Sequence, residues 1–570
     1  MVVFQSPLAS SPPTSSSTPA SPSRRCDPSL NSYRQYRAPV ENGSSLIEPP
    51  LSDAADLLGS NVAKSAEQGP FWDSLRTRAR ASLIEDAIRY TSAYRDTSWV
   101  DVESIGPIVM AGHQPSLFHP GVWFKNFALD DIARRVGGIG INLVVDNDVA
   151  SGSSIRVPSV RPHGATGAAQ PHYEVVSYDE AGGGVPYEQT TVRRRDLFDH
   201  FDEAVAEAVC GVVDDPSVTR LWRHALSAID RCGVAGCALA QARHGLEGEL
   251  GLRTLELPLG VVCRTSAYAE FVLAILTELP RFHGCYNDSA DRYRSAHGIR
   301  SSAHPVPNLA EQDGWFEAPL WIYGNDSPDR KAAWVKMSDD HLVISDRVAE
   351  GPRELRIDVR HPKLAAEQLS NLVSPNFKLR PRALVTTMYA RMVLSDLFLH
   401  GIGGGKYDQL GDQICAEFFQ VEPLQFMVIS ATIQLPGLVK VDHDKRIRSL
   451  RRQLRDLVFQ PERFADRVDL DENLLARKAE LIAMVATPKS GDLLASKMPA
   501  PKKQWHDEIA TINAELSKQL DQLRGQLRSE LAESERAHAA QRLMASREHP
   551  FCVFPIDYLQ TTYAKLLGQD

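Results

Sequence analysis

The feature that most constrains the fold is a pattern of strand, loop, helix and strand in the first third of the chain. Residues 107–111 and residues 141–145 are short apolar runs that suit buried strands. Between them, a polar loop at residues 112–121 leads into residues 122–136, where apolar side chains recur at helical spacing. Elements in this order form a βαβ unit, whose two strands run parallel. The sequence therefore predicts an α/β protein built on a parallel sheet.

The character of the other segments divides the chain into four parts. The first is rich in Ser and Pro and cannot bury a core, so we expect it to be disordered. A helical lead-in, the sheet core and a helical arm follow, and the core also holds a hairpin near residues 315–334 and a strand near residues 256–263. The expected boundaries are residues 1–35 for the tail, 36–105 for the lead-in, 106–435 for the core with a helical insertion at about 190–300, and 436–570 for the arm and a closing segment.

A long amphipathic helix dominates the last quarter of the chain. Residues 503–547 contain no Pro and one Gly, and their apolar side chains follow one stripe. The stripe consists of Ile509, Ile512, Leu516, Leu520, Leu523, Leu527 and Leu531. Its mean step of about 3.7 residues suits a nearly straight helix. Residues 447–457 offer an antiparallel partner, so we expect a coiled-coil arm whose stripe is covered partly by these residues and partly by a second subunit. The apolar residues 551–556 are expected to dock back as a strand.

Charge and composition argue against several functional classes. The net charge of −9 disfavours sequence-independent binding of nucleic acid, which needs a basic face. No apolar run is long enough to span a membrane, and the first residues lack the pattern of a secretory signal, so we expect a cytoplasmic protein. The eight cysteines are then expected to be reduced. The closest pair, Cys232 and Cys237, has no second Cys or His pair at zinc spacing.

The loop at residues 112–121 is the first candidate site. Parallel sheets bind ligands at the carboxyl ends of their strands, and this loop leads from a strand into a helix amino terminus, which favours anions. His113, His119 and Lys125 surround the loop and could hold a phosphate or a carboxylate. Alternatively, His113 bonds to the backbone and Lys125 is solvated.

Charged side chains elsewhere in the core supply further candidates. Asp146 and Asp148 follow the second strand, where a ribose or a metal-bound phosphate is often held; an Asp-rich turn is the alternative. Arg380 and Arg382 could together bind a substrate carboxylate, or both could be solvated.

A second glycine-rich loop follows residues 384–399, which suit a helix. Residues 401–405 hold four glycines and precede Lys406, but the Walker pattern fails because His400 stands at its first glycine and Tyr407 replaces Ser or Thr. The dinucleotide fingerprint G-x-G-x-x-G fails as well, because Lys406 stands at its last glycine. What remains is a flexible turn whose N–H groups and adjacent cation suit an anion; a plain connection between two helices is the alternative.

Three segments in order resemble the bacillithiol-biosynthesis cysteine-adding enzymes (the BshC family). Residues 112–125 are similar to the family's G-Q-Q-x-G-L-F-x-G-P-L-Y-x-x-Y-K. Residues 379–381 and 403–407 are similar to its L-R-P segment and its later G-G-P-x-E-x-x-Y turn. Residues 503–558 are similar to its coiled-coil arm and closing segment. Where the family has E-D-H-D, this chain has Val-Asp-Asn-Asp at residues 145–148.

The resemblance implies a Rossmann-like, nucleotidyltransferase-like core with helical insertions, and a coiled coil that forms a homodimer. It also implies a ligase that joins cysteine to the amino group of glucosaminyl-malate. We therefore expect an ATP-dependent ligase or nucleotidyltransferase that activates a carboxylate for attack by an amine, with ATP or ADP bound and Mg²⁺ as a further candidate. The alternative is a non-catalytic nucleotide-binding scaffold, which the missing Glu and His of E-D-H-D favour.

Each candidate residue has an expected role in such an enzyme. The residues expected to be catalytic are His113, His119 and Lys125. Those expected to bind the nucleotide are Gly112, Gln114, Asp146, Asp148, Gly403, Gly404, Gly405 and Lys406. Those expected to bind the second substrate are Arg380, Arg382 and Tyr407. We expect small-molecule substrates, no metal site formed by the protein alone, and neither nucleic acid nor membrane as a partner.

Overall fold

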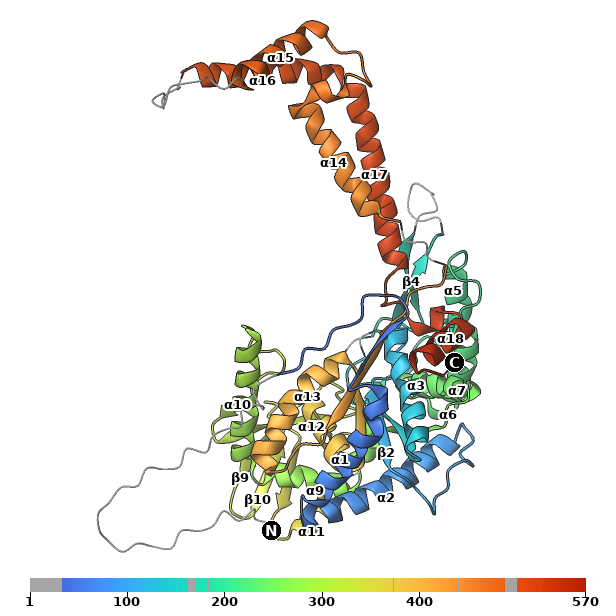
Figure 1. Cartoon of the computed structure of the whole chain (residues 1–570). Coiled ribbons are helices and arrows are strands. Elements are labelled where there is room, and N and C mark those ends of the chain that lie inside the picture. Colours follow the sequence, from blue (N-terminus) through green and yellow to red (C-terminus); the bar gives the residue numbers. More distant parts are fainter. Residues whose placement is uncertain are drawn as a thin grey trace, which may run out of the picture. The chain divides into compact units, whose positions relative to one another are not determined.

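The computed structural model describes residues 33–150, 152–161, 171–182, 184–372, 374–437, 441–486 and 500–569. The chain forms two compact units (Figure 1). The first comprises Met1–Val160, Tyr173–Gln434 and Arg547–Asp570, and the second comprises Arg161–His172 and Leu435–Ser546. Most of the expected Ser/Pro-rich tail lies outside the described residues.

A six-stranded sheet forms the centre of the first unit. Its order is β1-β14-β13-β2-β3-β6, and all neighbours are parallel except β1, which is antiparallel to β14. The strands are β1 (Ser44–Glu48), β2 (Ile108–His113), β3 (Ile139–Val144), β6 (Thr254–Pro258), β13 (Leu397–His400) and β14 (Phe426–Thr432). Numbered along the chain, the five parallel strands run 3-2-1-4-5 across the sheet, so the order reverses between β2 and β13. The predicted parallel βαβ unit is confirmed.

Helices cover both faces of this sheet (Figure 1). On one face lies α3 (Pro120–Arg135), and a Cβ at Gly140 of β3 would contact two of its apolar side chains. The next residue of β3, Ile141, points to the opposite face, where it shares a hydrophobic core with three other helices. These helices are α2 (Pro70–Ser92), α12 (Ala383–Tyr389) and α13 (Ile402–Ile414).

The lead-in and the insertion each add a strand to the sheet. The lead-in is not wholly helical, because β1 precedes α1 (Ala54–Ala66) and α2. The insertion contains β6, close to the strand expected near residues 256–263, although a helix already begins at Leu259. The helices of the insertion are α4 (Arg195–Asp199), α5 (Phe201–Ala208), α6 (Val218–Cys232), α7 (Ala235–Glu249), α8 (Leu259–Val262), α9 (Ser266–Leu276) and α10 (Leu279–His297).

A second sheet in the first unit is antiparallel, with the order β11-β10-β9-β8-β12. The predicted hairpin is confirmed as β8 (Trp315–Tyr323) and β9 (Lys331–Met337). The edge strand β12 places Arg380 in the first of the two pockets described below. The remaining elements are β4 (Ser154–Ser159), β5 (His172–Ser177), β7 (Glu311–Gln312), β10 (His341–Ser345), β11 (Glu354–Asp358), β12 (Lys378–Pro381) and α11 (Pro362–Ser370).

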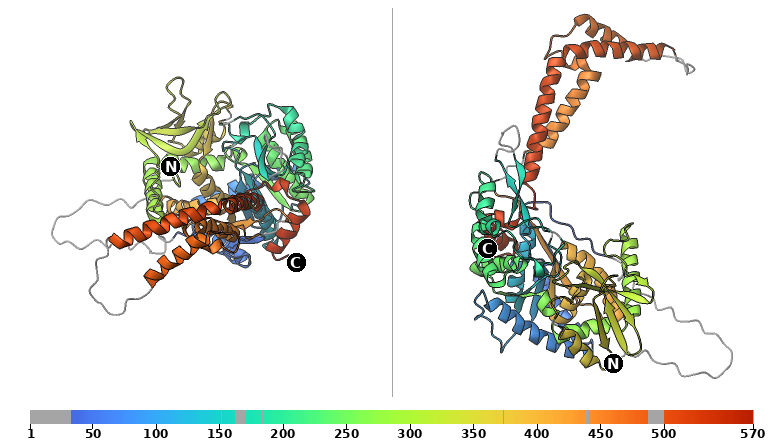
Figure 2. Two further views of the ribbon diagram at one scale, coloured as in Figure 1. Left: turned by 90° about the horizontal axis from the view of Figure 1, so that it is seen from above. Right: turned by 180° about the vertical axis from the view of Figure 1, so that it is seen from behind.

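The second unit is helical. It consists of α14 (His443–Phe459), α15 (Glu472–Ala486), α16 (Ala500–Gln519) and α17 (Asp521–Met544). The single long helix predicted for residues 503–547 is wrong, because the helix is interrupted at Leu520. The antiparallel partner is present: α14 and α17 lie side by side (Figures 1 and 2), with Asp444 near His538, and the other end of α14 accepts a hydrogen bond from Asn513 of α16.

The apolar stripe of the arm is covered by the chain itself. Five stripe residues are at most 5% exposed and pack with Leu450 and Leu457 of α14. These stripe residues are Ile512, Leu516, Leu520, Leu523 and Leu527. The expectation that part of this stripe needs a second subunit is therefore wrong.

The closing segment docks on the first unit as helix rather than strand. Residues 551–553 form a short 3₁₀ turn, and α18 (Ile556–Leu566) follows. The N–H of Phe551 donates to the carbonyl of Phe118 at 2.8 Å, and the hydroxyl of Tyr563 donates to the carbonyl of Pro120 at 2.8 Å. Within the described ranges, no helix has the length and hydrophobicity needed to cross a lipid bilayer.

Candidate active site at the carboxyl edge of the parallel sheet

The carboxyl edge of the parallel sheet brings together the two loops that the sequence singled out. β2 ends at His113 and β13 ends at His400, and these neighbouring strands flank the point at which the strand order reverses. The predicted nucleotide-binding segments at residues 112–114 and 403–406 therefore follow adjacent strands, although they are far apart in the sequence.

Lys125 is buried behind the first loop. It is 2% exposed, and its Nζ donates to the carbonyl of Gly112 at 2.7 Å. Burial, and then the nearby positive charge of Arg243, lower the pKa of Lys125 to about 7. The alternative of a solvated lysine is therefore wrong. A buried amine with such a pKa is easily charged by an approaching anion.

The two histidines of this loop are neutral at pH 7. Burial, and then the charge of Lys125, lower the pKa of His113 to about 3, and its Nδ1 lies 3.0 Å from the carbonyl of Gln114. The alternative that His113 bonds to the backbone is confirmed. His119 caps α3, because its Nδ1 accepts a hydrogen bond from the N–H of Gly121 at 3.1 Å, and burial lowers its pKa to about 4. Neither imidazole supplies a positive charge.

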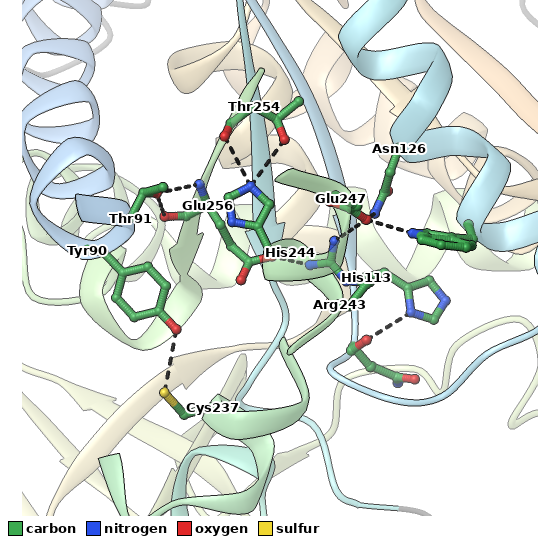
Figure 3. Close-up of polar contacts among 12 residues, drawn as sticks. Tyr90, Thr91, His113, Asn126, Cys237, Arg243, His244, Glu247, Thr254 and Glu256 are labelled. Carbon is green, nitrogen blue, oxygen red and sulfur yellow. Dashed lines mark hydrogen bonds and ion pairs between the residues drawn. The ribbon is translucent and has the colours of Figure 1, made fainter. Parts of the chain in front are cut away.

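A buried ion-pair network holds α3 in place (Figure 3). Arg243 pairs with Glu247 at 2.7 Å and also with Glu256, and both carboxylate side chains are fully buried. Glu247 accepts further hydrogen bonds from Trp123 and Asn126 of α3, at 2.8 and 2.7 Å. The network thereby ties the helix that contains the buried lysine to α7 and β6.

The second glycine-rich segment is the start of a helix, not a flexible loop. The helix predicted over residues 384–399 ends at Leu394, β13 follows, and α13 begins at Ile402, so most of the glycines lie in its first turn. Tertiary packing has overridden the low helix propensity of glycine. The first N–H groups of α13 have no acceptor within the helix, so the segment can still bind an anion. Lys406 is partly exposed and Tyr407 is 42% exposed.

Two of the glycines allow α13 to pack closely. A Cβ at Gly404 would lie 2.7 Å from Nδ1 of His400, and a Cβ at Gly405 would lie 2.4 Å from a methyl carbon of Val428. A Cβ at Gly403 would meet nothing within 4 Å. Gly404 and Gly405 are thus needed for packing, whereas Gly403 is not.

This difference predicts opposite effects of two neighbouring substitutions. Gly404→Ala should lower the free energy of unfolding by about 1–3 kcal/mol, because it overpacks a buried contact. Gly403→Ala should raise it by up to about 1 kcal/mol, because it only restricts the unfolded chain. Urea denaturation measures both variants, and equal effects would contradict the close packing of α13.

His400 belongs to a buried network with Asp408 of α13. Its Nε2 lies 2.9 Å from Oδ2 of Asp408, and Arg391 and Thr387 donate to the same carboxylate. Burial alone would raise the pKa of Asp408, but Arg391 holds it well below its ordinary value. This network fixes the junction between β13 and α13.

A pocket of about 300 Å³ opens on one side of the segment that follows β3. Asp146 and Glu188 both line it, and a Cβ at Gly260 would lie 3.0 Å from one oxygen of each. Arg380 donates to both oxygens of Glu188, at 3.1 and 3.0 Å. The N–H of Gly260 donates to Asp146 at 2.9 Å. The buried arginine therefore pairs with Glu188, and Asp146 forms no ion pair within the described residues.

The two carboxyl groups differ in acidity. Burial, and then the negative charge of Glu188, raise the pKa of Asp146 to about 7. Burial would also raise the pKa of Glu188, but Arg380 lowers it below its ordinary value. Asp146 is therefore partly protonated at neutral pH, which suits a group that donates or accepts a proton.

Asp146→Asn is expected to remove a pH dependence of stability. A carboxyl group whose pKa is raised in the folded state keeps a proton that the unfolded chain releases. Its contribution to the free energy of unfolding is therefore fully present below about pH 4 and is lost as the pH rises to 7. The wild type should lose at most about 1.4 kcal/mol per pH unit relative to Asp146→Asn over this window. Urea denaturation at a series of pH values measures this difference. If the free energies of unfolding of the wild type and of Asp146→Asn change in parallel with pH, Asp146 has an ordinary pKa.

A second pocket, of about 320 Å³, opens on the other side of the same segment. Asp148 lines it, pairs with Arg330 at 2.9 Å and accepts a hydrogen bond from Gln114. Asp146 and Asp148 therefore line different pockets. Among the described residues, no group of three or more His, Cys, Asp or Glu side chains is arranged to hold a metal ion.

The two arginines expected to bind a substrate carboxylate also lie in different pockets. Arg380 lines the first and holds Glu188, whereas Arg382 lines the second and pairs with Glu317 at 2.5 Å. The alternative of two solvated cations is wrong, since both side chains are about nine-tenths buried. They are not placed to act together on one carboxylate.

Several residues of these pockets escaped the sequence analysis. Glu188, Arg330 and Lys378 stand in segments without a motif. Glu188 meets Arg380 across 192 positions of the chain, and no local pattern signals such a contact. Besides Asp146 and Arg380, the close spacing of Cys232 and Cys237 was a visible signal for the first pocket, which both cysteines line.

Comparison of the chain with models of known protein families finds no match, and comparison with curated protein sequences finds none.

Proposed function

We propose that this chain is an ATP-dependent ligase or nucleotidyltransferase, which binds ATP or ADP at the carboxyl edge of its parallel sheet. The single observation that supports this most is the strand order 3-2-1-4-5. It is the order of five of the strands in the Rossmann-like folds, which bind nucleotides where the order reverses. Here the reversal lies between β2 and β13, the strands that precede the two glycine-bearing segments.

Three groups near the reversal suit a polyphosphate. The free N–H groups at the start of α13 favour an anion, Lys406 lies in the same helix, and Lys125 can take up a proton when negative charge arrives. Mg²⁺ would enter with the phosphates, as it commonly does in phosphoryl-transfer sites.

The adjoining 300 Å³ pocket suits the amine and the carboxylate. Asp146 has a pKa near 7 and can accept the proton that an attacking amine must lose. Lys378 and Arg264 line the same pocket, and neither forms an ion pair within the described part of the chain, so both are available for a substrate carboxylate. In this proposal they take over the role expected of Arg382.

Isothermal titration calorimetry with ATP and ADP, with and without Mg²⁺, tests the proposal. Lys406→Ala should weaken nucleotide binding by about tenfold to a hundredfold, because a charge-assisted contact contributes about 1.5–3 kcal/mol. Lys363→Ala is the matched control, since Lys363 is an exposed lysine in the first turn of α11. A wild-type chain that binds neither nucleotide would overturn the proposal.

A turnover assay separates the ligase from the scaffold alternative. Cysteine and glucosaminyl-malate, the substrates implied by the resemblance, are the first pair to supply with ATP, and mass spectrometry would detect the amide and the nucleotide product. Nucleotide binding without turnover on this or any other pair of carboxylate and amine would favour a scaffold.

We also propose a cytoplasmic location and a homodimer formed through the coiled-coil arm. Because the leucine stripe is covered, the contact must use other apolar side chains of the arm. Val458 and Phe459 at the end of α14 are 46% and 65% exposed. Phe459→Ser should shift a dimer toward monomer in multi-angle light scattering without changing the melting temperature of the arm. A wild type that is monomeric at micromolar concentration would contradict the dimer.

A further inference from the structure

Two cysteines lie in the wall of the 300 Å³ pocket. Cys232 is the last residue of α6, Gly233 has a φ of 66° that reverses the chain, and Cys237 lies in the first turn of α7. This tight helical hairpin therefore brings to one pocket wall two cysteines that are five positions apart.

The surroundings hold the two sulfur atoms in different ways. Cys232 donates to the carbonyl of Val234 at 3.4 Å, whereas Cys237 accepts from Gln241 at 3.3 Å and lies 3.5 Å from the hydroxyl of Tyr90 (Figure 3). Both cysteines line the pocket and neither is fully buried. A small molecule in the pocket can therefore reach them.

The pair is poised for nucleophilic attack by Cys232. The neighbouring Cys237 thiol lowers the pKa of Cys232 to about 7, although burial opposes this, and Arg231 contributes in the same direction. The neighbouring Cys232 and burial raise the pKa of Cys237, whose sulfur lies beside the hydroxyl of Tyr90. At neutral pH the pair thus contains one partly ionised thiol and one protonated thiol.

We propose that Cys232 and Cys237 form a thiol–disulfide exchange site that takes an anionic low-molecular-weight disulfide from the pocket. The Cys232 thiolate attacks one sulfur of the disulfide, a mixed disulfide forms, and the first small thiolate leaves. Cys237 then attacks the sulfur of Cys232, the internal disulfide forms, and the second small thiolate leaves. The small disulfide gains two electrons, and the two protons of the cysteines end on the two released thiols.

The charges around the pocket select an anion. Lys378 and Arg264 are its two cations without an ion pair in the described part of the chain. Of the other charged groups that line it, Glu188 is neutralised by Arg380, and Asp146 is partly protonated at neutral pH. The proposal does not depend on nucleotide binding, because the two thiols and the two cations suffice for it.

The test uses the full chain, reduced and freed of reductant, with three small disulfides of matched size. These are the dianionic dithiodiglycolate, the neutral bis(2-hydroxyethyl) disulfide and the dicationic cystamine. Mass spectrometry of tryptic peptides should show a Cys232–Cys237 disulfide, and two small thiols are released for each such disulfide formed. Dithiodiglycolate should react about tenfold faster than cystamine at low salt, and added salt should reduce the difference. Equal or faster reaction of cystamine would overturn the choice of an anionic ligand.

Single substitutions separate the two cysteines. Cys237→Ser should accumulate a mixed disulfide at Cys232, and Cys232→Ser should form no internal disulfide. Cys210→Ser is the matched control, since Cys210 is exposed and lies outside the pocket, and it should react like the wild type at Cys232. Lys378→Gln should reduce the preference for the anion. The proposed exchange site would be wrong if Cys237→Ser formed no adduct at Cys232 or if the wild type formed no internal disulfide. Circular dichroism verifies that each variant is folded.

Discussion

Arg243→Met is expected to lower the free energy of unfolding by about 3–5 kcal/mol, because it leaves two buried carboxylates without their cation. Arg243 is the positive centre between Glu247 and Glu256, whose side chains are fully buried (Figure 3). Even beside the arginine, burial raises the pKa of Glu256 to about 7. Without the arginine, both carboxyl groups must take up protons or the structure must open to water. Urea denaturation at pH 7 measures the loss.

A compensating variant tests that explanation. Arg243→Met combined with Glu247→Gln and Glu256→Gln removes all three charges, so most of the lost stability should return. The loss in Arg243→Met alone should also be smaller at pH 5 than at pH 8, since a carboxyl group with a raised pKa binds its proton at the lower pH. If the triple variant is as unstable as Arg243→Met, the cause is lost packing of the arginine stem, not unpaired charge.

The elements that the sequence predicted well are those whose signal is local. The strands and helix of the βαβ unit are near their expected positions, because a short apolar run and a helical period are both visible in one sequence. The stripe of α2 is buried as its period indicates; it consists of Leu75, Ala79, Leu83 and Ala87. The hairpin of β8 and β9 had a turn signal between two alternating segments.

The secondary-structure predictions that were wrong concern segments whose conformation depends on tertiary packing. Residues 397–400 are a short apolar run that continues a helical segment, and only their place in the sheet makes them a strand. The glycines of α13 predict a loop because glycine disfavours helices, yet Gly405 is needed for contact with Val428 of β14. The break between α16 and α17 at Leu520 has no Gly or Pro at that position that would have predicted it.

The candidate site was predicted by position better than by role. The sequence located both loops, because the carboxyl ends of strands are where such sheets bind ligands. It could not show that His119 caps a helix or that Arg380 holds Glu188, since each contact depends on the folded chain. The burial of Lys125 was equally invisible, because a lysine in the second turn of a helix has no sequence mark of burial.

Lys125→Met is expected to stabilise the protein while weakening nucleotide binding. The pKa of Lys125 is about 7 in the folded protein, below its ordinary value of about 10.4. Between these two pKa values the unfolded chain binds a proton that the folded chain does not, so the buried lysine lowers the free energy of unfolding. This loss of stability is absent above about pH 10.5, grows as the pH falls to 7, and is constant below pH 7. Met fills similar volume without a charge. After loss of the hydrogen bond to Gly112, the net gain at pH 7 should be on the order of 2–3 kcal/mol.

The same substitution should weaken the binding of ATP and ADP by about tenfold to a hundredfold, as for loss of a charge-assisted hydrogen bond. Stability and binding would then change in opposite directions, which is the mark of a residue kept for function at a cost in stability. Lys363→Met, at an exposed lysine in α11, is the control and should change neither.

Proton uptake on binding is the most direct sign that Lys125 meets a phosphate. At pH 8 the buried amine is mostly neutral, and a bound polyphosphate would raise its pKa, so each binding event should take up nearly one proton. Calorimetry of ATP binding in two buffers with different ionisation enthalpies measures that number, and Lys125→Met should reduce it toward zero. If the wild type binds ATP without proton uptake, and Lys125→Met binds it equally well, the phosphates lie elsewhere on the sheet edge. The buried lysine would then be a structural residue whose amine serves only the carbonyl of Gly112.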